Sequence, residues 1–280
     1  MSNIDQSISS LIELDEFIDI VDIGANPIDG LPPYKPLLEK NLARVIGFEP
    51  NEEALSQLEV LKGPNEEYLG KAVYDGHPQQ LRICNSEGMS SLLEPNASVL
   101  KFLHGFHTWG EVKERKTIET VRLDDVEEIT NIDYLKIDIQ GGELEVFKNA
   151  LTSLSQCCVI HTEVEFLQMY ENQPLFSDVD LFLREQGFLF HQFRPLVSRV
   201  IKPLVLNKDV CAELSQATWA DAVFIKDFTK FRELQPIKLK KIALILNDIY
   251  SSVDISMRAL LAVDDALRTN YAKKYLKYLS

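Results

Sequence analysis

Polar side chains suited to binding a nucleoside follow two apolar segments near the start of the chain. The first segment leads into Asp22, Gly24 and Asn26, and the next one leads into Glu49. A glycine at a strand end lets a ligand approach the backbone, and a carboxylate at the end of the second strand suits the two hydroxyls of a ribose. These residues indicate a nucleoside-binding crevice, although residues 22–26 alone would also fit a capped strand-to-helix turn.

A second group of ionisable residues lies in two later apolar segments. Lys136, Asp138 and Gln140 alternate in one of them, and His161 and Glu163 alternate in the other. Because a charge is costly in the middle of a parallel sheet, these groups should lie toward the carboxyl ends of the strands, where open α/β proteins bind ligands. We expect Glu163 to belong to the site and His161 to be a satisfied core histidine.

Other polar and aromatic residues are less specific. Glu143 opens a helical segment, where a carboxylate complements the helix N-terminus. Tyr34, His107 and Trp109 lie on flanking loops and fit either contact with a substrate or local packing. Trp219 precedes the last expected strand and is expected to pack.

A largely parallel sheet would position these residues. Apolar, β-rich segments alternate with helical ones at intervals too long for hairpins, which predicts an α/β fold with helices on both faces of the sheet. Expected strands are 17–23, 45–48, 68–73, 134–139 and 159–162, and expected helices are 36–41, 52–62, 142–153 and 178–186.

Three segments depart from this alternation. Residues 80–120 predict an elaborated loop over the sheet, with a short strand at 81–84. Residues 188–193 and 222–225 are expected to pair in antiparallel fashion at the sheet edge. Between them, residues 196–216 are interpreted as a surface insertion.

The last part of the chain has a different pattern. From Leu239 to Leu276 apolar residues recur at helical spacing, which predicts two or three helices, and Pro236 marks their start. We therefore expect a domain over residues 1–230 and a helical extension over residues 231–280. The extension has three possible roles: closing the active site, forming a homodimer, or packing against the core.

Bulk properties exclude several classes of function. The chain has 280 residues and a net charge of -14, which would repel nucleic acid. No apolar run is long enough for a membrane span, and residues 1–16 lack the pattern of a secretory signal. Four cysteines show no zinc spacing and suit a reducing compartment, so we expect a cytoplasmic protein.

The motifs together resemble the FkbM family of methyltransferases that depend on S-adenosylmethionine (SAM). The resemblance implies a Rossmann-like seven-stranded SAM-methyltransferase sheet with a C-terminal helical extension, and O-methylation of hydroxyls in saccharides, polyketides or related metabolites. It rests on Asp22-Ile23-Gly24-Ala25-Asn26, Phe48-Glu49-Pro50, Leu135-Lys136-Ile137-Asp138, Gly141, Glu143 and Glu163.

The resemblance also implies a role for individual residues. Residues 22–26 would hold the methionine end of SAM, Glu49 the ribose, and Asp138 would lie beside the sulfonium. The adenine side would fall to Ala72, Val73, Ser90 and Ser91. The full cofactor-binding set is Asp22, Gly24, Ala25, Asn26, Glu49, Pro50, Ala72, Val73, Ser90, Ser91, Asp138 and Gln140.

Two positions depart from the family pattern. A proline-rich loop over residues 27–34 replaces the glycine that commonly follows Asn26, and it is expected to reshape the mouth of the cofactor site. Gln140 stands where many members carry glutamate, which removes a negative charge, so we expect no metal.

An alcohol acceptor would need its proton accepted or its oxygen oriented, and Asp138 and Glu163 are the candidate catalytic residues.

One alternative function is that of a nicotinamide-dependent oxidoreductase, since Glu49 also suits a dinucleotide, although the sequence lacks G-x-G-x-x-G. The other is a noncatalytic protein that keeps the fold.

Overall fold

The central sheet has seven strands, six parallel and one reversed. In the computed structural model, which describes residues 8–27 and 30–280, the strand order is β10-β11-β9-β8-β1-β2-β3, and β11 is antiparallel to both of its neighbours. This confirms the predicted Rossmann-like sheet with an antiparallel edge. The strands are β1 Ile18–Ile23, β2 Ala43–Phe48, β3 Glu66–Leu69, β8 Tyr134–Ile137, β9 Val159–Glu165, β10 Phe188–Arg199 and β11 Gln216–Lys226.

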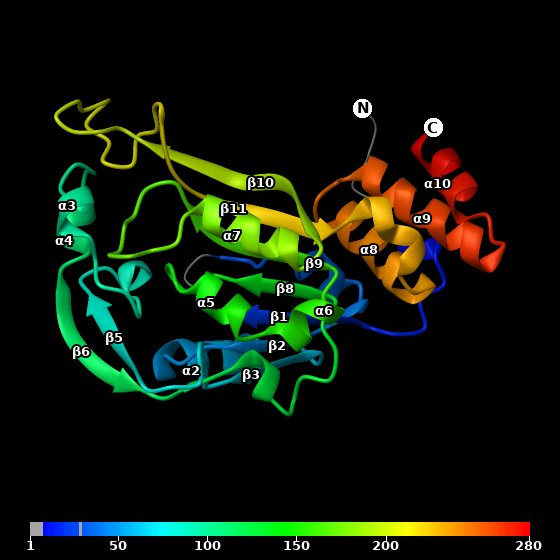
Figure 1. Ribbon diagram of the computed structural model, residues 1–280, viewed down its shortest axis with the longest axis horizontal. Coiled ribbons are helices and arrows are strands. Elements are labelled where there is room, and N and C mark those ends of the chain that lie inside the picture. The colour runs from blue at the N-terminus through cyan, green and yellow to red at the C-terminus, as the bar shows by residue number, and fades with distance from the viewer. Residues whose placement is uncertain (1–7, 28–29) are drawn as a thin grey trace.

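Three helices cover one face of this sheet. They are α5 (Glu143–Lys148), α6 (Leu151–Gln156) and α7 (Phe176–Glu185), which lie in front of the strands in Figure 1. The expected single helix over 142–153 is wrong, because the chain breaks into α5 and α6 at Asn149 and Ala150. Their apolar side chains pack on alternate residues of the strands, including Val21, Ile23, Leu135, Ile137 and Ile160.

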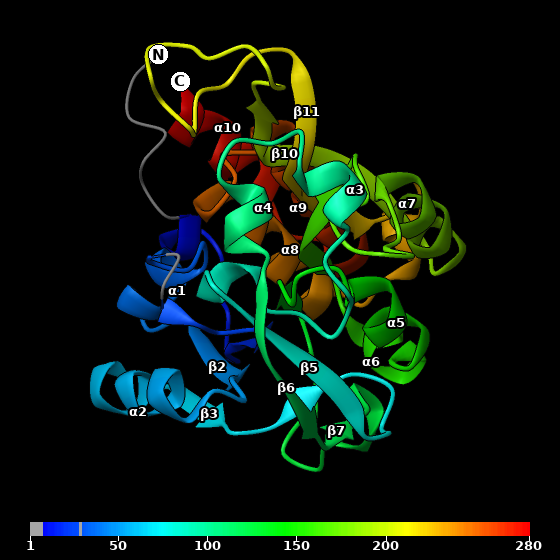
Figure 2. The same ribbon diagram turned by 90° about the vertical axis from the view of Figure 1, so that its left-hand side faces the viewer.

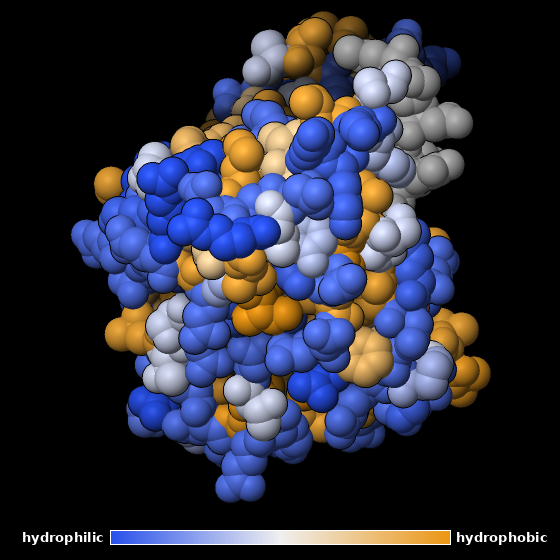
Figure 3. Space-filling model, turned by 90° about the vertical axis from the view of Figure 1, so that its right-hand side faces the viewer, coloured by the Kyte–Doolittle hydropathy of each residue, from blue (hydrophilic) through white to orange (hydrophobic). Residues whose placement is uncertain are grey.

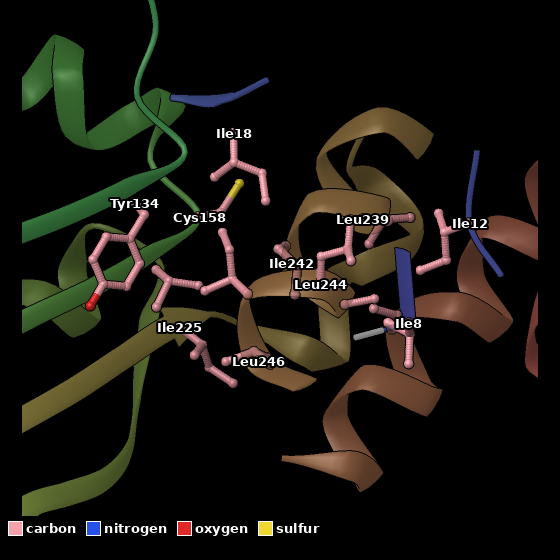
Figure 4. Packing of buried hydrophobic residues seen from close by; sticks show 14 of the residues in the cluster. Ile8, Ile12, Ile18, Tyr134, Cys158, Ile225, Leu239, Ile242, Leu244 and Leu246 are labelled. Carbon is pink, nitrogen blue, oxygen red and sulfur yellow. The ribbon is translucent and has the colours of Figure 1, made fainter. Parts of the chain in front are cut away.

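The C-terminal helices lie at the amino end of the strands (Figure 1). They are α8 (Pro236–Asp248), α9 (Val253–Leu267) and α10 (Tyr271–Leu279), and α8 begins where Pro236 predicts. Figure 4 shows Ile242 and Leu246 facing the residues at this end of the sheet, such as Tyr134 and Ile225, and Leu239 and Leu244 belong to the same apolar cluster. Of the three expected roles, packing is therefore confirmed; the helices lie opposite the carboxyl ends and do not close a site there.

Buried charges attach α8 to the sheet. Asp133, fully buried just before β8, accepts hydrogen bonds from Lys238 Nζ at 2.6 Å and from Lys241 Nζ at 2.7 Å. The backbone N–H of Asp19 donates to the same carboxylate at 2.9 Å. Burial alone would raise the pKa of Asp133, but these donors hold it below its usual range.

A second layer of structure lies across the carboxyl ends of the strands (Figure 2). It contains an antiparallel pair, β5 (Gln79–Cys84) and β6 (Val112–Ile118), joined by a segment that includes α3 (Ala97–Leu100) and α4 (Phe106–Trp109). The loop expected over residues 80–120 is thus wrong in part, since only the strand near 81–84 was expected.

Two further predictions need correction. The strand expected over 68–73 is two strands, because β3 ends at Leu69 and β4 (Ala72–Val73) turns away to pair with β7 (Thr120–Val121). The insertion expected over 196–216 is shorter, because β10 and β11 extend into it and pair as far as Arg199 with Gln216. The remaining helices are α1 Lys35–Glu39 and α2 Glu52–Leu61, with short 3-10 turns at Ile8–Ser10, Glu87–Met89, Leu123–Asp125 and Phe228–Glu233.

The outer surface at the helical end is mainly hydrophilic. Figure 3 shows apolar side chains there in separated groups among polar ones. Leu261, Leu267 and Leu276 are the exposed leucines of α9 and α10. The expected homodimer stays a prediction. Within residues 8–27 and 30–280, no helix has the length and apolar character that crossing a membrane requires.

The packing of α8 predicts a large effect of truncating its core. Leu244 is fully buried in the cluster that joins α8 to the sheet, whereas Leu276 is 62% exposed. We expect Leu244→Ala to lower the free energy of unfolding by about 2–5 kcal/mol, through lost burial and a residual cavity. Leu276→Ala, the matched control, should change it by less than about 0.5 kcal/mol in urea denaturation. Equal losses would contradict this account of the core.

Candidate active site

A cavity of about 360 Å³ opens on the face of the sheet opposite α5–α7. Neighbouring strands contribute side chains to it in register, because Asp22 pairs with Lys136 and Lys136 pairs with His161. Glu163 on β9 pairs with Asp221 on β11 in the same way. Paired residues, and residues two apart on one strand, point to the same face of a sheet, so these five side chains lie together on the cavity floor.

An ion pair lies in the middle of this floor. Lys136 Nζ lies 3.2 Å from Asp22 Oδ1 and donates to the carbonyl of Gly24 at 3.2 Å. Tyr34, at the start of α1, donates its hydroxyl to Asp22 Oδ2 at 2.6 Å. Burial and the neighbouring Asp22 carboxylate raise the pKa of Tyr34 well above its usual value, so this hydroxyl keeps its proton. Tyr34 lines the cavity and is almost fully buried, and its contact with a substrate stays a prediction.

Gly24 makes the close turn after β1 possible. Its φ is +80°, and a Cβ atom there would lie 1.9 Å from the carbonyl oxygen of Asp138. The backbone N–H groups of Gly24 and Ala25 both donate to the Phe48 carbonyl, at 3.0 and 3.1 Å. The turn therefore joins the ends of β1, β2 and β8, as a nucleoside crevice at this edge requires.

Glu49 lies at the end of β2, as predicted. It is 5% exposed, and its Oε1 accepts from the Asn51 N–H at 2.8 Å. Burial raises the pKa of Glu49. Glu87 Oε1 accepts from the side-chain amides of Asn26, at 3.4 Å, and Asn51, at 3.2 Å. Glu87, which sequence reasoning missed, thus makes the crevice between β1 and β2 more acidic.

Gln140 joins the two candidate catalytic carboxylates. Its Nε2 donates to Asp138 Oδ1 at 2.9 Å and to Glu163 Oε2 at 3.0 Å, and its Oε1 accepts from the Tyr170 hydroxyl at 3.2 Å. Both carboxylates line the cavity. Burial, and after it the charge of Asp138, raises the pKa of Glu163 well above its usual value.

Glu143 is the first residue of α5, as expected, but its carboxylate turns back to the segment that precedes the helix. Its Oε1 accepts from the N–H groups of Ile139, at 2.8 Å, and Gly141, at 3.1 Å, and burial raises its pKa to about 7. Ligand atoms of Asp138, Glu143 and Glu163 lie within 4.8 Å of one another, a spacing that a metal ion would accept. The expectation of no metal stays a prediction.

The residues expected on the adenine side are held by other parts of the protein. Ser91 Oγ donates to the Gln140 carbonyl at 2.7 Å, and Ser90 Oγ accepts from the Cys84 N–H at 3.1 Å. Val73 packs in the core beneath α5–α7, Ala72 is half-buried and Pro50 is exposed. Their contact with SAM stays a prediction.

The loop after Asn26 does reach the site. Pro27 and residues 30–34 line the cavity, whereas residues 28–29 lie outside the described part of the chain, as do residues 1–7. His107 and Trp109 are on α4, and Trp109 packs against Phe106 with ring centroids 5.1 Å apart. Neither is among the described lining residues of the cavity.

The predictions for His161 and for β11 differ most from the structure. His161 is buried and both of its ring nitrogens have a partner, as expected, but it also lines the cavity. Asp221 and Arg194 line it too and were missed. The available signal was a charge inside the apolar run that includes Ala222. Trp219 packs on Phe106, as predicted.

The turn at Gly24 gives a matched pair of glycine variants. Gly30 also has a positive φ, +91°, but a Cβ atom there would meet nothing within 4 Å. We expect Gly30→Ala to cost about 1 kcal/mol of stability from backbone strain alone. Gly24→Ala should cost several-fold more or prevent folding, since its Cβ would collide with the Asp138 carbonyl. Thermal unfolding measures both, and similar melting temperatures would refute the close approach.

The raised pKa of Glu163 predicts how stability depends on pH. The folded protein keeps this proton at pH values where the unfolded chain has released it, so stability falls as pH rises from the usual glutamate range toward the folded pKa. Glu163→Gln keeps an oxygen for Gln140 and removes the titration. The variant should therefore gain stability over the wild type as pH increases from 5 to 8 in calorimetric scans. A constant difference across this range would argue against a raised pKa.

Comparisons with known proteins identify the family of this chain. The family described as "Methyltransferase FkbM domain" matches residues 22–190. The 2-O-methyltransferase NoeI of Sinorhizobium fredii is 27% identical over 185 residues, which cover 63% of this chain and 75% of that protein.

Solved methyltransferase structures also match this chain, at low sequence identity. Methyltransferase FkbM from Methylobacillus flagellatus KT is 14% identical with a TM-score of 0.44, and the match covers 78% of this chain but only 45% of that one. Precorrin-6y C5,15-methyltransferase from Geobacter metallireducens GS-15 is 15% identical with a TM-score of 0.39, covering 78% and 85%. Because the family match spans more than half of the chain, this protein belongs to the FkbM family of methyltransferases.

Proposed function

We propose that this protein transfers a methyl group from SAM to a hydroxyl of a saccharide or related small metabolite. One observation carries the proposal: the carboxylates of Asp138 and Glu163, joined by Gln140, line a cavity at the strand ends that also form the Glu49 crevice. The name of the NoeI relative, a 2-O-methyltransferase, supports an oxygen acceptor.

The crevice has the chemistry that SAM requires. SAM carries a sulfonium and an ammonium group, and Glu49, Glu87 and Asp138 make this edge of the sheet acidic. In our proposal Glu49 accepts the ribose hydroxyls, and Asn26 and the Gly24 turn hold the methionine end. Asp22 contributes indirectly, since its carboxylate already holds Tyr34 and Lys136. Ala72, Val73, Ser90 and Ser91 would border the adenine.

The reaction needs an acceptor oxygen in line with the methyl group and a place for its proton. When bound, SAM supplies an electrophilic methyl group. Asp138 and Glu163 orient the acceptor hydroxyl, and one of them accepts the proton as the O–H bond is replaced by O–CH₃. Gln140 fixes the distance between the two carboxylates, because its amide nitrogen is bonded to both.

The other expectations follow from this assignment. Membership of a methyltransferase family gives no support to the oxidoreductase alternative. Four free cysteines, of which Cys84, Cys157 and Cys158 are buried, fit our proposal of a cytoplasmic location.

Calorimetric titration with SAM and with S-adenosylhomocysteine tests the cofactor. We expect micromolar binding by the wild type, weakened about 10- to 100-fold in Glu49→Gln through loss of charged hydrogen bonds to the ribose. Glu53→Gln, a matched change on the exposed side of α2, should leave the affinity unchanged. Equal affinity in Glu49→Gln and wild type would remove Glu49 from the site.

The acceptor test uses methyl glycosides of common hexoses and 6-deoxyhexoses, with methylation followed by mass spectrometry. Asp138→Asn and Glu163→Gln should lower kcat by about 10²–10⁴-fold while SAM binding is retained. If the wild type binds SAM but methylates no glycoside, the proposed acceptor class is wrong and the noncatalytic alternative gains support.

A further inference from the structure

The turn between α8 and α9 contacts two residues that line the cavity. Tyr250 lies in this turn, fully covered, and its hydroxyl is 2.9 Å from His161 Nδ1 and 2.7 Å from the Tyr134 hydroxyl. Its backbone carbonyl accepts from Arg194 Nη2 at 3.0 Å. Two cavity residues, His161 and Arg194, are therefore held by one residue outside the methyltransferase sheet.

The polar neighbours of His161 favour one tautomer. Its Nε2 forms a 3.2 Å ion-pair contact with Asp221 Oδ2, and because a carboxylate oxygen accepts, we assign the proton of the neutral ring to Nε2. Nδ1 then accepts from the Tyr250 hydroxyl, whose oxygen accepts in turn from Tyr134. Every donor in this chain meets an acceptor, and the chain ends on the Asp221 carboxylate.

Asp221 is placed to contact an acceptor molecule. Its side chain is 34% exposed and lines the cavity. It is the register partner of Glu163, and side chains opposite each other in an antiparallel pair have Cβ atoms about 4.5–5.5 Å apart. Two carboxylates at this spacing suit two neighbouring hydroxyls of one polyol, one at the reacting position and one beside it.

We propose that Asp221 binds a second hydroxyl of the acceptor, and that Tyr250 of the C-terminal helices positions it through His161. The acceptor class is a polyol with adjacent hydroxyls, such as a saccharide. The binding part of this inference rests on the proposed function, whereas the positioning part does not. The helical extension therefore takes part in the site from the opposite end of the strands.

Histidine NMR tests the positioning part without any substrate. The protein has five histidines, so ring ¹⁵N signals are few, and loss of a signal in His161→Asn assigns it. In Tyr250→Phe we expect the Nδ1 signal of His161 to shift by several ppm, and in Asp221→Asn the Nε2 signal. Tyr275→Phe is the control, because that buried hydroxyl of α10 donates to Asn247 instead, at 2.6 Å. If the Nδ1 signal of His161 is unchanged in Tyr250→Phe, or its Nε2 signal is unchanged in Asp221→Asn, the proposed positioning of Asp221 by Tyr250 through His161 is wrong.

Acceptor kinetics test the binding part. With a methyl glycoside that the wild type methylates, Asp221→Asn should raise the KM for the glycoside about tenfold or more, and Tyr250→Phe about threefold, with SAM affinity unchanged. With a deoxy glycoside that lacks the neighbouring hydroxyl, the KM of the wild type should also rise about tenfold or more. In Asp221→Asn, replacing the glycoside by its deoxy form should raise the KM little further. An unchanged KM in Asp221→Asn would overturn the assignment.

A failure of the proposed function would look different. In that case the wild type would methylate no glycoside. Saturation-transfer NMR of the same methyl glycosides would then test whether Asp221 takes part in binding them. Binding that Asp221→Asn weakens would support the assignment, and absence of binding to the wild type would overturn it. In either case, the ¹⁵N chemical shift of His161 Nδ1 in Tyr250→Phe tests whether Tyr250 positions His161.

Discussion

The site depends on a pair of opposite charges buried on adjacent parallel strands. Asp22 and Lys136 are register partners on β1 and β8, and neither would be stable there without the other, because an isolated buried charge costs several kcal/mol. Pairing them makes one face of the sheet polar at its carboxyl end. The opposite face, where Val21 and Leu135 point, is free to be wholly apolar and packs on α5–α7.

One face of the sheet thus serves two purposes along its length. Its amino half packs against α8 and α9, and its carboxyl half is the cavity floor. The boundary falls at Tyr134 and Tyr250, whose rings lie in the apolar cluster while their hydroxyls bond to each other and onward to His161. Aromatic rings with a polar tip suit such a boundary, since they bury surface and still satisfy a hydrogen bond.

Sequence reasoning predicted the parts of the fold that have strong local signals. Apolar segments ending in Asp22, Glu49 or Glu163 identified strands and their polar ends correctly. Strand β6 was missed because neighbouring residues such as Glu114 and Arg115 are charged and exposed on opposite faces, which removes the alternation of a half-buried strand. Asp221 on β11 comes to the cavity, and Tyr250 comes to His161 behind it, only through tertiary contacts that no spacing in the sequence indicates.

The two ends of the described chain meet in one apolar cluster. Ile8 and Ile12 pack with α8 and α9, as Figure 4 shows, and the Ile8 N–H lies 3.3 Å from Asp248 Oδ1, 240 residues along the chain. During synthesis the early strands emerge with Ile18, Ala43 and Tyr134 uncovered, because the helices that bury these residues are translated after all the strands of the sheet. The protein therefore exposes apolar surface on the ribosome until α8 and α9 are released, and chaperones have their opportunity to bind in that interval.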